Sequence, residues 1–355
     1  MRRLVILGGG YGGLRILQRL LSSYLPIDLE IILVDREPFH CMKTEYYALA
    51  AGTISDQDVR VAYPQHPKFS FVFGEVTNID LENNQIEIKD RDEPLAYDEL
   101  VIGLGSEDKY HDVPGADEFT LSIQSIDGAR QTSQVLSNLP PNGIVAIVGG
   151  GLSGVEMASE LRESRPDLTI QLYDRGKRIL SDFSERLSSY VEKWFIEHDV
   201  KIINESNITK VKKNKLYNNG EPIEVDAIVW TAGIQPHHLV RELQVEKDRY
   251  HRIVLSPHHY IPAYPNVYVV GDCASLPHSP SAQLAEEQAE QIVSVMIKRW
   301  NGEELAELPP IKLKGVLGSL GTKSGFGVMG GTSLTGRVAR LLKSGVLWLY
   351  KRSNV

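Results

Sequence analysis

Cysteine is scarce in this chain, which has two among its 355 residues, Cys41 and Cys273. Two cysteines cannot build a disulfide framework or a cysteine-rich metal site, so we expect a reducing, cytoplasmic setting and no metal centre. Adjacent histidines occur at 237–238 and at 258–259. Neither pair has partner ligands nearby in the sequence, and we expect both pairs to lie in loops.

Long apolar runs and an excess of basic charge are lacking as well. No window approaches the ~18 consecutive apolar residues of a membrane-spanning helix. The chain has 38 Lys and Arg against 46 Asp and Glu, a formal charge of −8, which argues against a nucleic-acid-binding protein. It starts directly on a predicted strand, without a signal peptide. At ~100 to 200 residues per domain, its length predicts about two domains.

Glycine, in contrast, forms a pattern that occurs twice, each time after a short apolar run. The pattern Gly-x-Gly-x-x-Gly predicts a strand that turns sharply into a helix. The first glycine permits the turn, the second admits a diphosphate, and the third lets helix and strand pack closely. The N–H groups at the helix N-terminus then face the anion. The two sets are Gly8, Gly10 and Gly13, and later Gly149, Gly151 and Gly154.

A second predicted strand that ends in an acid follows each glycine pattern. LEIILVDRE ends near Asp35, and LTIQLYDRG ends near Asp174. An acid about 20 residues beyond the glycines binds the ribose hydroxyls of a dinucleotide, so we predict two dinucleotide sites. Asp174 favours NADH, because an acid there repels the 2′-phosphate of NADPH. Arg175, Lys177 and Arg178 keep NADPH as the less favoured alternative.

The repeated pattern predicts an α/β protein with two Rossmann-like domains, one inserted into the other. The first domain covers residues 1–112 and resumes at 250–318, where VYVVGDCA supplies a strand that completes its sheet. Asp272 follows this strand, at the sheet edge where ligands bind. The inserted domain covers 113–249, and 319–355 form a short C-terminal segment.

An amphipathic helix is predicted within the C-terminal segment. Such a helix can lie on an anionic membrane surface. Docking on its own protein or in a homodimer interface is the open alternative. Its apolar positions at helical spacing are Leu334, Val338, Leu341, Leu342 and Leu349, and its basic positions are Arg337, Arg340, Lys343, Lys351 and Arg352.

These motifs resemble the two-dinucleotide flavoprotein reductases over about residues 1–345. The finer similarity is to the type II NADH dehydrogenases, single-chain NADH:quinone oxidoreductases that pump no protons. It is carried by DREPFHCMKTEYYALAAGTIS, by GVE after the second glycine pattern, by AQLAEEQ and by GVLGSLGTKSGFGVMGG. The resemblance implies a first domain that binds FAD and an inserted domain that binds NADH. Typical members continue for several tens of residues beyond the position of Val355.

The resemblance also implies a role for each matching position. Glu156 matches the family's glutamate beside the nicotinamide, and Glu156 and Gln288 are the expected catalytic residues. One departure is Gly103-Leu104-Gly105, where the family has Ala-Thr-Gly. The implied FAD positions are Gly8, Gly10, Gly13, Asp35, Gly105, Gly271, Asp272 and Gln283. The implied NADH positions are Gly149, Gly151, Gly154, Asp174 and Gly233, and the quinone positions are Ala282, Gln283 and Gln288.

We expect hydride transfer from NADH to FAD and electron transfer onward to a quinone. Structural explanations stay open, since the helix dipole alone favours Glu156 and a solvated helix face would explain Gln283 and Gln288. Two other functions also stay open. Cys41 could serve as the thiol of a peroxidase or CoA-disulfide reductase, although Tyr46 stands where a redox partner cysteine would be. The second is a regulatory flavoprotein that responds to NADH with little turnover.

Overall fold

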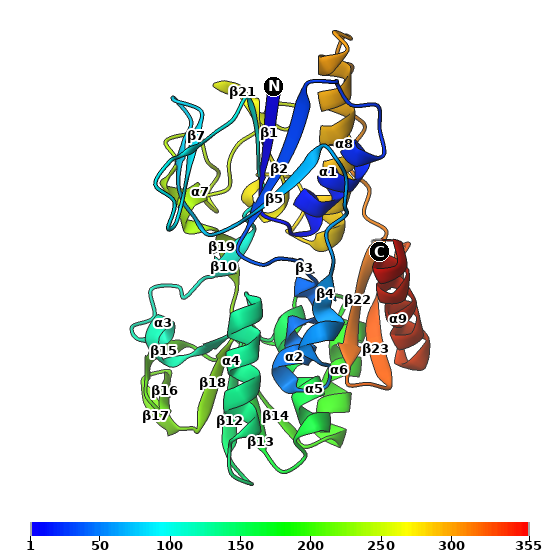
Figure 1. Ribbon diagram of the computed structural model, residues 1–355. Helices are drawn as coiled ribbons and strands as arrows, with labels where there is room; N and C mark the ends of the chain where they lie inside the picture. Colours follow the sequence, from blue (N-terminus) through cyan, green and yellow to red (C-terminus); the bar gives the residue numbers. More distant parts are fainter. Residues whose placement is uncertain (1, 354–355) are drawn as a thin grey trace.

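The structure of this chain is a computed structural model that describes residues 2–353. Two α/β bodies lie end to end, and a small C-terminal unit rests at the side of the second body (Figure 1). The first body draws strands from both ends of the chain, and the second body is inserted between them. The predicted α/β architecture with two Rossmann-like domains is thereby confirmed.

The first body is built on a six-stranded sheet in the order β20-β21-β9-β1-β2-β5, in which β20 alone runs antiparallel to its neighbour. Successive side chains of a strand point to opposite faces. Leu4 and Ile6 therefore pack under helices α1 and α8, whereas Val5 and Leu7 pack under a three-stranded meander. The elements are β1 (Arg2–Leu7), α1 (Tyr11–Leu21), β2 (Leu29–Asp35), β5 (Phe69–Phe73), β6 (Val76–Asp80), β7 (Gln85–Ile88), β8 (Leu95–Ala96), β9 (Glu99–Ile102), β20 (Tyr260–Ile261), β21 (Tyr264–Val269), η3 (Gly271–Cys273) and α8 (Ala282–Trp300).

The second body repeats this plan with a parallel five-stranded sheet, β11-β18-β12-β13-β14. Val145 and Ile147 of the central strand face helices α4, α5 and α6, and Ala146 and Val148 face a second meander. The elements are α3 (Ala116–Phe119), β11 (Leu121–Ser122), α4 (Ile126–Ser137), β12 (Ile144–Val148), α5 (Leu152–Ser164), β13 (Thr169–Tyr173), α6 (Glu185–Glu197), β14 (Val200–Ile203), β15 (Ile208–Lys212), β16 (Lys215–Asn218), β17 (Glu221–Glu224) and β18 (Ala227–Trp230).

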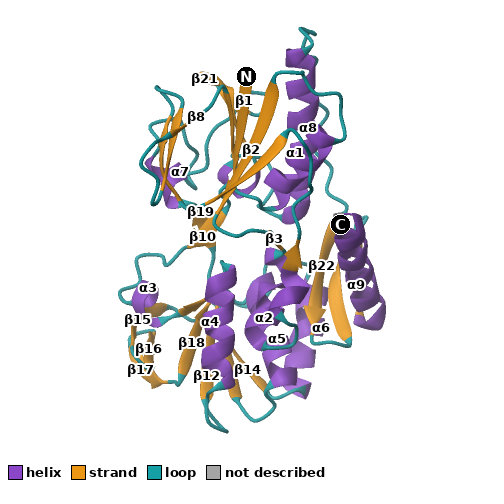
Figure 2. Ribbon diagram, viewed as in Figure 1, coloured by secondary structure: helices purple, strands orange, loops and turns teal. Residues whose placement is uncertain are grey.

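A two-stranded ribbon connects the bodies, as Figure 2 shows between the two sheets. The chain leaves the first body through β10 and returns through β19. Directly afterwards, α7 buries Leu239 and Val240 in the core of the first body. The crossings therefore precede residues 113 and 249, where the sequence predicted the domain boundaries. The elements are β10 (Ser106–Asp108), β19 (Ile234–Pro236) and α7 (His238–Glu242).

A segment of the predicted first domain packs on the second body. Its helix α2 contacts α4 and α5, and Tyr46, Leu49 and Val59 are buried in the same core as Val155 of α5. Residues 40–61 thus form a second connection between the two bodies, made by packed side chains, in addition to the ribbon. The elements are β3 (His40–Cys41), η1 (Lys43–Glu45), α2 (Tyr46–Ala51), η2 (Asp56–Val59) and β4 (Arg60–Val61).

The C-terminal unit is an antiparallel sheet followed by the expected terminal helix, α9. Leu320 and Phe326 of this sheet are buried in the core of the second body, which holds the unit in place. Within residues 2–353, every helix falls short of the length or the apolarity that a membrane crossing requires. The elements are β22 (Gly315–Leu320), β23 (Ser324–Met329), β24 (Thr332–Thr335) and α9 (Gly336–Ser353).

Candidate functional site

A cavity of about 990 Å³ lies where the first body, the start of α5 and helix α9 meet. Its walls include the glycine loop after β1, the end of β2 and the turns that follow β9 and β21. These are carboxyl ends of parallel strands, where ligands bind in such sheets. The second body contributes Leu152, Ser153 and Glu156, and α9 contributes Lys343, Val346, Leu347 and Tyr350.

The glycine loop after β1 is a cradle that side chains would fill. Gly8 has φ +93°, and a Cβ there would lie 2.4 Å from the Gly103 carbonyl oxygen. A Cβ on Gly13 would lie 2.0 Å from the Gly8 oxygen. At Gly10, by contrast, a Cβ would meet no atom of the described chain within 4 Å. The first and third glycines are thus required by the protein itself, and the second leaves room for a ligand, as dinucleotide binding demands.

Asp35 closes the same loop from the end of β2. Its Oδ2 accepts a hydrogen bond of 2.5 Å from the Gly9 N–H, and its Oδ1 accepts one of 2.8 Å from Glu37 N–H. Burial raises the pKa of Asp35 above its usual value, and these hydrogen bonds oppose that rise. The acid therefore organises the loop and also lines the cavity.

The other positions expected for FAD, and the positions expected for the quinone, gather around the cavity with one exception. Gly105, Gly271, Asp272 and Gln283, expected for FAD, line it, as does Ala282, expected for the quinone. Asp272 accepts a hydrogen bond of 2.6 Å from the Ser106 hydroxyl. Gln283 accepts one of 3.1 Å from the backbone N–H of Lys314.

The exception is Gln288, which the structure does not bring to the cavity wall among the described residues. It is fully buried, accepts a hydrogen bond of 2.8 Å from Gly271 N–H and donates one of 2.9 Å to the Val269 carbonyl. These contacts tie α8 to the turn that carries Asp272. Gln288 thus holds that turn in place. Its side chain points into the body, because Leu284, Gln288 and Ile292 follow at four-residue spacing and form the buried face of α8.

The second glycine loop reproduces the first. Gly149 has φ +112°, and a Cβ on Gly154 would lie 1.8 Å from the Gly149 oxygen. At Gly151 a Cβ would again meet no described atom within 4 Å. Asp174 accepts hydrogen bonds from Gly150 N–H at 2.8 Å and from Gly176 N–H at 2.7 Å. Gly233, also expected at this site, has φ +127° and follows β18.

Glu156 enters a buried polar cluster that the sequence does not reveal. Its Oε1 accepts a hydrogen bond of 2.9 Å from Ser319 N–H and forms a close ion pair with the Lys343 ammonium. Lys343 also donates to the Tyr47 hydroxyl at 2.6 Å and lies 3.6 Å from a Glu45 carboxylate oxygen. The cluster therefore joins α2, α5, β22 and α9 at the cavity.

Two cations, Lys343 and Arg340, act on the carboxylates of this cluster. The pKa of Glu45 is raised to about 7, chiefly by burial and also by the nearby Glu156, although Lys343 and Arg340 oppose the rise. Burial also raises the pKa of Tyr47 well above its usual value. Glu45 can therefore take up or release a proton near neutral pH.

Lys343 itself was expected on the basic outer face of the terminal helix, and that prediction is wrong. Only 9% of its side chain is exposed. The inward stripe of α9 is Ala339, Lys343, Leu347 and Tyr350, spaced by three or four residues. Helical spacing alone could have placed these four residues on one face of the helix. The sequence, however, does not indicate which buried acid would pair with the lysine.

Comparisons with known proteins agree with this site. A family model described as pyridine nucleotide-disulphide oxidoreductase matches residues 2–289. The chain belongs to this family. It is therefore an oxidoreductase, and family membership supports FAD and NADH as its cofactors.

Two relatives illustrate the range of similarity within the family. The NADH dehydrogenase-like protein YutJ of Bacillus subtilis is 62% identical over 355 residues, which cover 100% of this chain and 100% of that protein. A type II NADH:quinone oxidoreductase of Staphylococcus epidermidis is 26% identical over 380 residues, covering 96% of this chain and 93% of that protein. The resemblance to type II NADH dehydrogenases is confirmed.

Solved structures share the fold. NDH2 from Plasmodium falciparum in complex with NADH aligns with a TM-score of 0.82 at 16% identity, over 97% of this chain and 94% of that one. The sulfide:quinone oxidoreductase of Aquifex aeolicus aligns with a TM-score of 0.82 at 17% identity, over 100% and 92%.

The disulphide chemistry in the family's description finds no support in the thiols of this chain. Cys41 and Cys273 are both free. Burial raises the pKa of each thiol to about 12, so both stay protonated at neutral pH. Cys41 hence lacks the low-pKa thiolate that a peroxidase or CoA-disulfide reductase requires.

Proposed function

We propose that this protein oxidises NADH with FAD and passes the electrons to a quinone-type acceptor at the cavity. One observation carries the proposal: the loop after β1 lines the cavity, and the helix that the second loop begins reaches it through Glu156. Two dinucleotides held by these loops would therefore meet there. The relatives, an NADH dehydrogenase-like protein and type II NADH:quinone oxidoreductases, support the same chemistry.

The chain's own residues bind and orient the reactants. The Gly8 loop and Asp35 would hold FAD, and the Gly149 loop and Asp174 would hold NADH. Bound FAD supplies the acceptor for the hydride and the donor for the second substrate. Glu156, on the first turns of α5, would orient the nicotinamide end of NADH at the cavity.

Quinone reduction consumes protons, and the buried cluster is placed to supply them. Glu45, with its pKa raised to about 7, holds a proton close to the Lys343 ammonium and the Tyr47 hydroxyl. Lys343 lines the cavity directly. A proton at Lys343 Nζ can therefore pass to an acceptor in the cavity and be replaced from Glu45.

The outer face of α9 supports a route for an apolar acceptor. Leu341 is 71% exposed and Trp348 57%, and Arg337 and Arg352 flank them. An exposed apolar face with basic flanks fits an anionic membrane surface. Since the inner stripe of the same helix lines the cavity, a quinone leaving the membrane would travel along α9.

Spectroscopy of the flavin tests the redox part of the proposal. The purified protein should show flavin absorbance that bleaches with anaerobic NADH and returns on adding a water-soluble quinone. The Cys41→Ser variant should behave in the same way. Bleaching without return would support another acceptor or the regulatory alternative, and loss of turnover in Cys41→Ser would support the thiol enzyme.

Co-sedimentation tests the membrane part. Vesicles that contain phosphatidylglycerol should bind the wild-type protein and bind Leu341→Ser/Trp348→Ser much more weakly. Ile196→Ser is the matched control, since Ile196 is 73% exposed and belongs to α6 rather than to α9. Absence of vesicle binding, together with a dimer that the α9 variant dissociates, would assign the face to a homodimer instead.

A further inference from the structure

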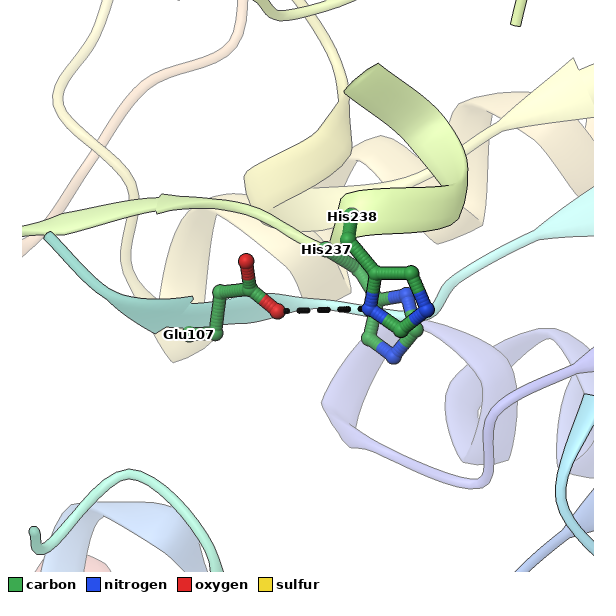
Figure 3. Close-up of side chains that lie close together, drawn as sticks. All are labelled: Glu107, His237 and His238. Carbon is green, nitrogen blue, oxygen red and sulfur yellow. Dashed lines mark ion pairs between the residues drawn. The ribbon is translucent and has the colours of Figure 1, made fainter. Parts of the chain in front are cut away.

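Three metal-ligating side chains meet beside the ribbon that connects the two bodies. Glu107 lies in β10, and His237 and His238 stand at the start of α7, directly after β19. Figure 3 shows the carboxylate of Glu107 pointing toward the two imidazole rings. One ligand atom from each of the three residues lies within 4.8 Å of the others. The expectation that this histidine pair lies in a loop without partner ligands is therefore wrong.

We propose that Glu107, His237 and His238 form a binding site for a divalent transition-metal ion, with Zn²⁺ as the best-suited ion. Two imidazoles and one carboxylate form the donor set of many zinc sites, which leaves a fourth position for water. Imidazole donors favour Zn²⁺, Ni²⁺ or Cu²⁺ over Mg²⁺ and Ca²⁺, which prefer oxygen ligands.

A neighbouring guanidinium acts on the carboxylate of this site. Glu107 Oε1 is held in an ion pair by Arg241, while Oε2 lies 3.5 Å from Nδ1 of His238. The guanidinium fixes the carboxylate, but its charge also opposes a metal ion. We therefore expect micromolar affinity.

Small side-chain movements would complete the coordination. Ligand atoms bound to one tetrahedral Zn²⁺ lie about 3.4 Å apart, given bonds of about 2.0–2.2 Å. The present separations reach 4.8 Å. The ring of His238 lies against that of His237, with 4.3 Å between the ring centroids, but its side chain is 47% exposed, so rotation of the ring can close the difference.

Such an ion would connect residues from both passages of the chain between the bodies, the outgoing strand β10 and the returning strand β19. Glu107 pairs with Gln235 across the ribbon, so the carboxylate comes from the outgoing strand and both rings follow the returning strand. His237 also lines the cavity. The ion would thus sit at the edge of the cavity and restrain the angle between the bodies.

Metal titration of the untagged holoprotein tests the site without reference to turnover. Competition with a chromophoric chelator should give one equivalent of Zn²⁺ with micromolar affinity, and Co²⁺ should produce the visible absorption of tetrahedral coordination. His238→Gln and Glu107→Gln should each weaken binding at least tenfold. His251→Gln, at another exposed histidine, should bind like the wild type.

Two results would overturn the proposal. One is a wild-type protein that binds no Zn²⁺ saturably, and the other is a His238→Gln variant that binds as tightly as the wild type. Flavin absorbance and circular dichroism report whether each variant is folded. Because Glu107 pairs with Arg241, the half-exposed His238 carries the test if Glu107→Gln loses its fold.

Discussion

The two glycine loops of this protein are built alike and surrounded differently. Each has a first glycine at positive φ, a third glycine pressed on the first, and an acid that accepts a hydrogen bond from the loop. The first loop forms part of the cavity wall together with α8, α9 and the segment 40–61. From the second body, only the start of α5 and the start of α4 reach that wall among the described residues.

The shared motif accounts for dinucleotide binding at both loops. The surroundings of each loop determine how far the bound dinucleotide is enclosed. A dinucleotide enclosed by helices from three parts of the chain suits a resident cofactor. A dinucleotide held by one loop and one helix suits a substrate that binds and leaves with each turnover. These surroundings support the proposal that FAD binds at the first loop and NADH at the second.

Alanine at the third glycine of each loop should separate the two roles most strongly. Gly13→Ala should purify without flavin, because its Cβ would lie 2.0 Å from the Gly8 oxygen. Gly154→Ala should keep its flavin but reduce it with NADH on the order of 100-fold less efficiently. Absorbance spectra and stopped-flow reduction measure both. A Gly154→Ala protein that lost flavin while Gly13→Ala kept it would reverse the assignment.

Removal of the positive charge of Lys343 tests the buried polar cluster around Glu156. Lys343→Met should lower the free energy of unfolding by about 3–5 kcal/mol, because Glu156 would remain buried without its ion-pair partner. Adding Glu156→Gln to this variant should recover much of the loss, whereas quinone turnover should stay low in both. Chemical denaturation measures the stabilities. Equal stability of Lys343→Met and wild type would show that the cluster is not buried as described.

Substitution of the two acids compares the loops directly. Asp174→Asn should raise the KM for NADH about tenfold and improve the use of NADPH relative to NADH, because the repulsion of a 2′-phosphate is removed. Asp35→Asn should change flavin content and leave the ratio of NADPH to NADH use unaltered. Steady-state kinetics on flavin-loaded protein checks both. An unchanged preference in Asp174→Asn would exclude this acid as the ribose ligand.

The pH dependence of stability should reveal the titration of Glu45. The pKa of Glu45 rises from 4.5 to about 7 on folding, so the folded chain binds this proton more tightly than the unfolded chain. The free energy of unfolding should therefore decrease as pH rises from 4.5 to about 7 and level off above. Glu45→Gln should remove this decrease, which amounts to about 2–3 kcal/mol between pH 5 and pH 8.

Denaturation curves at the two pH values measure this effect. Glu221→Gln, at an exposed acid of β17, is the matched control and should keep the wild-type dependence. If Glu45→Gln kept it too, the titrating group would lie elsewhere.

Much of the fold could be predicted because its rules are local. A buried strand, three spaced glycines, a helix and an acid use contacts within about 30 residues, so both Rossmann-like units follow from the sequence. The roles of Gly8, Gly149, Asp35 and Asp174 in shaping the loops follow in the same way. Gln288 was expected at the cavity but is buried in the body. A sequence motif gives residue types and does not say which way each side chain of α8 points.

Other features were decided only by tertiary packing. Lys343 looked like part of a solvated basic face, and burial against Glu156 depends on a helix that lies far from α5 in the sequence. Glu107 joins His237 and His238 because β10 and β19 pair across the insertion. Sequence determined the two dinucleotide loops, whose hydrogen bonds are local, whereas the fold alone decided which charges are buried together, because those contacts join segments separated by an entire domain.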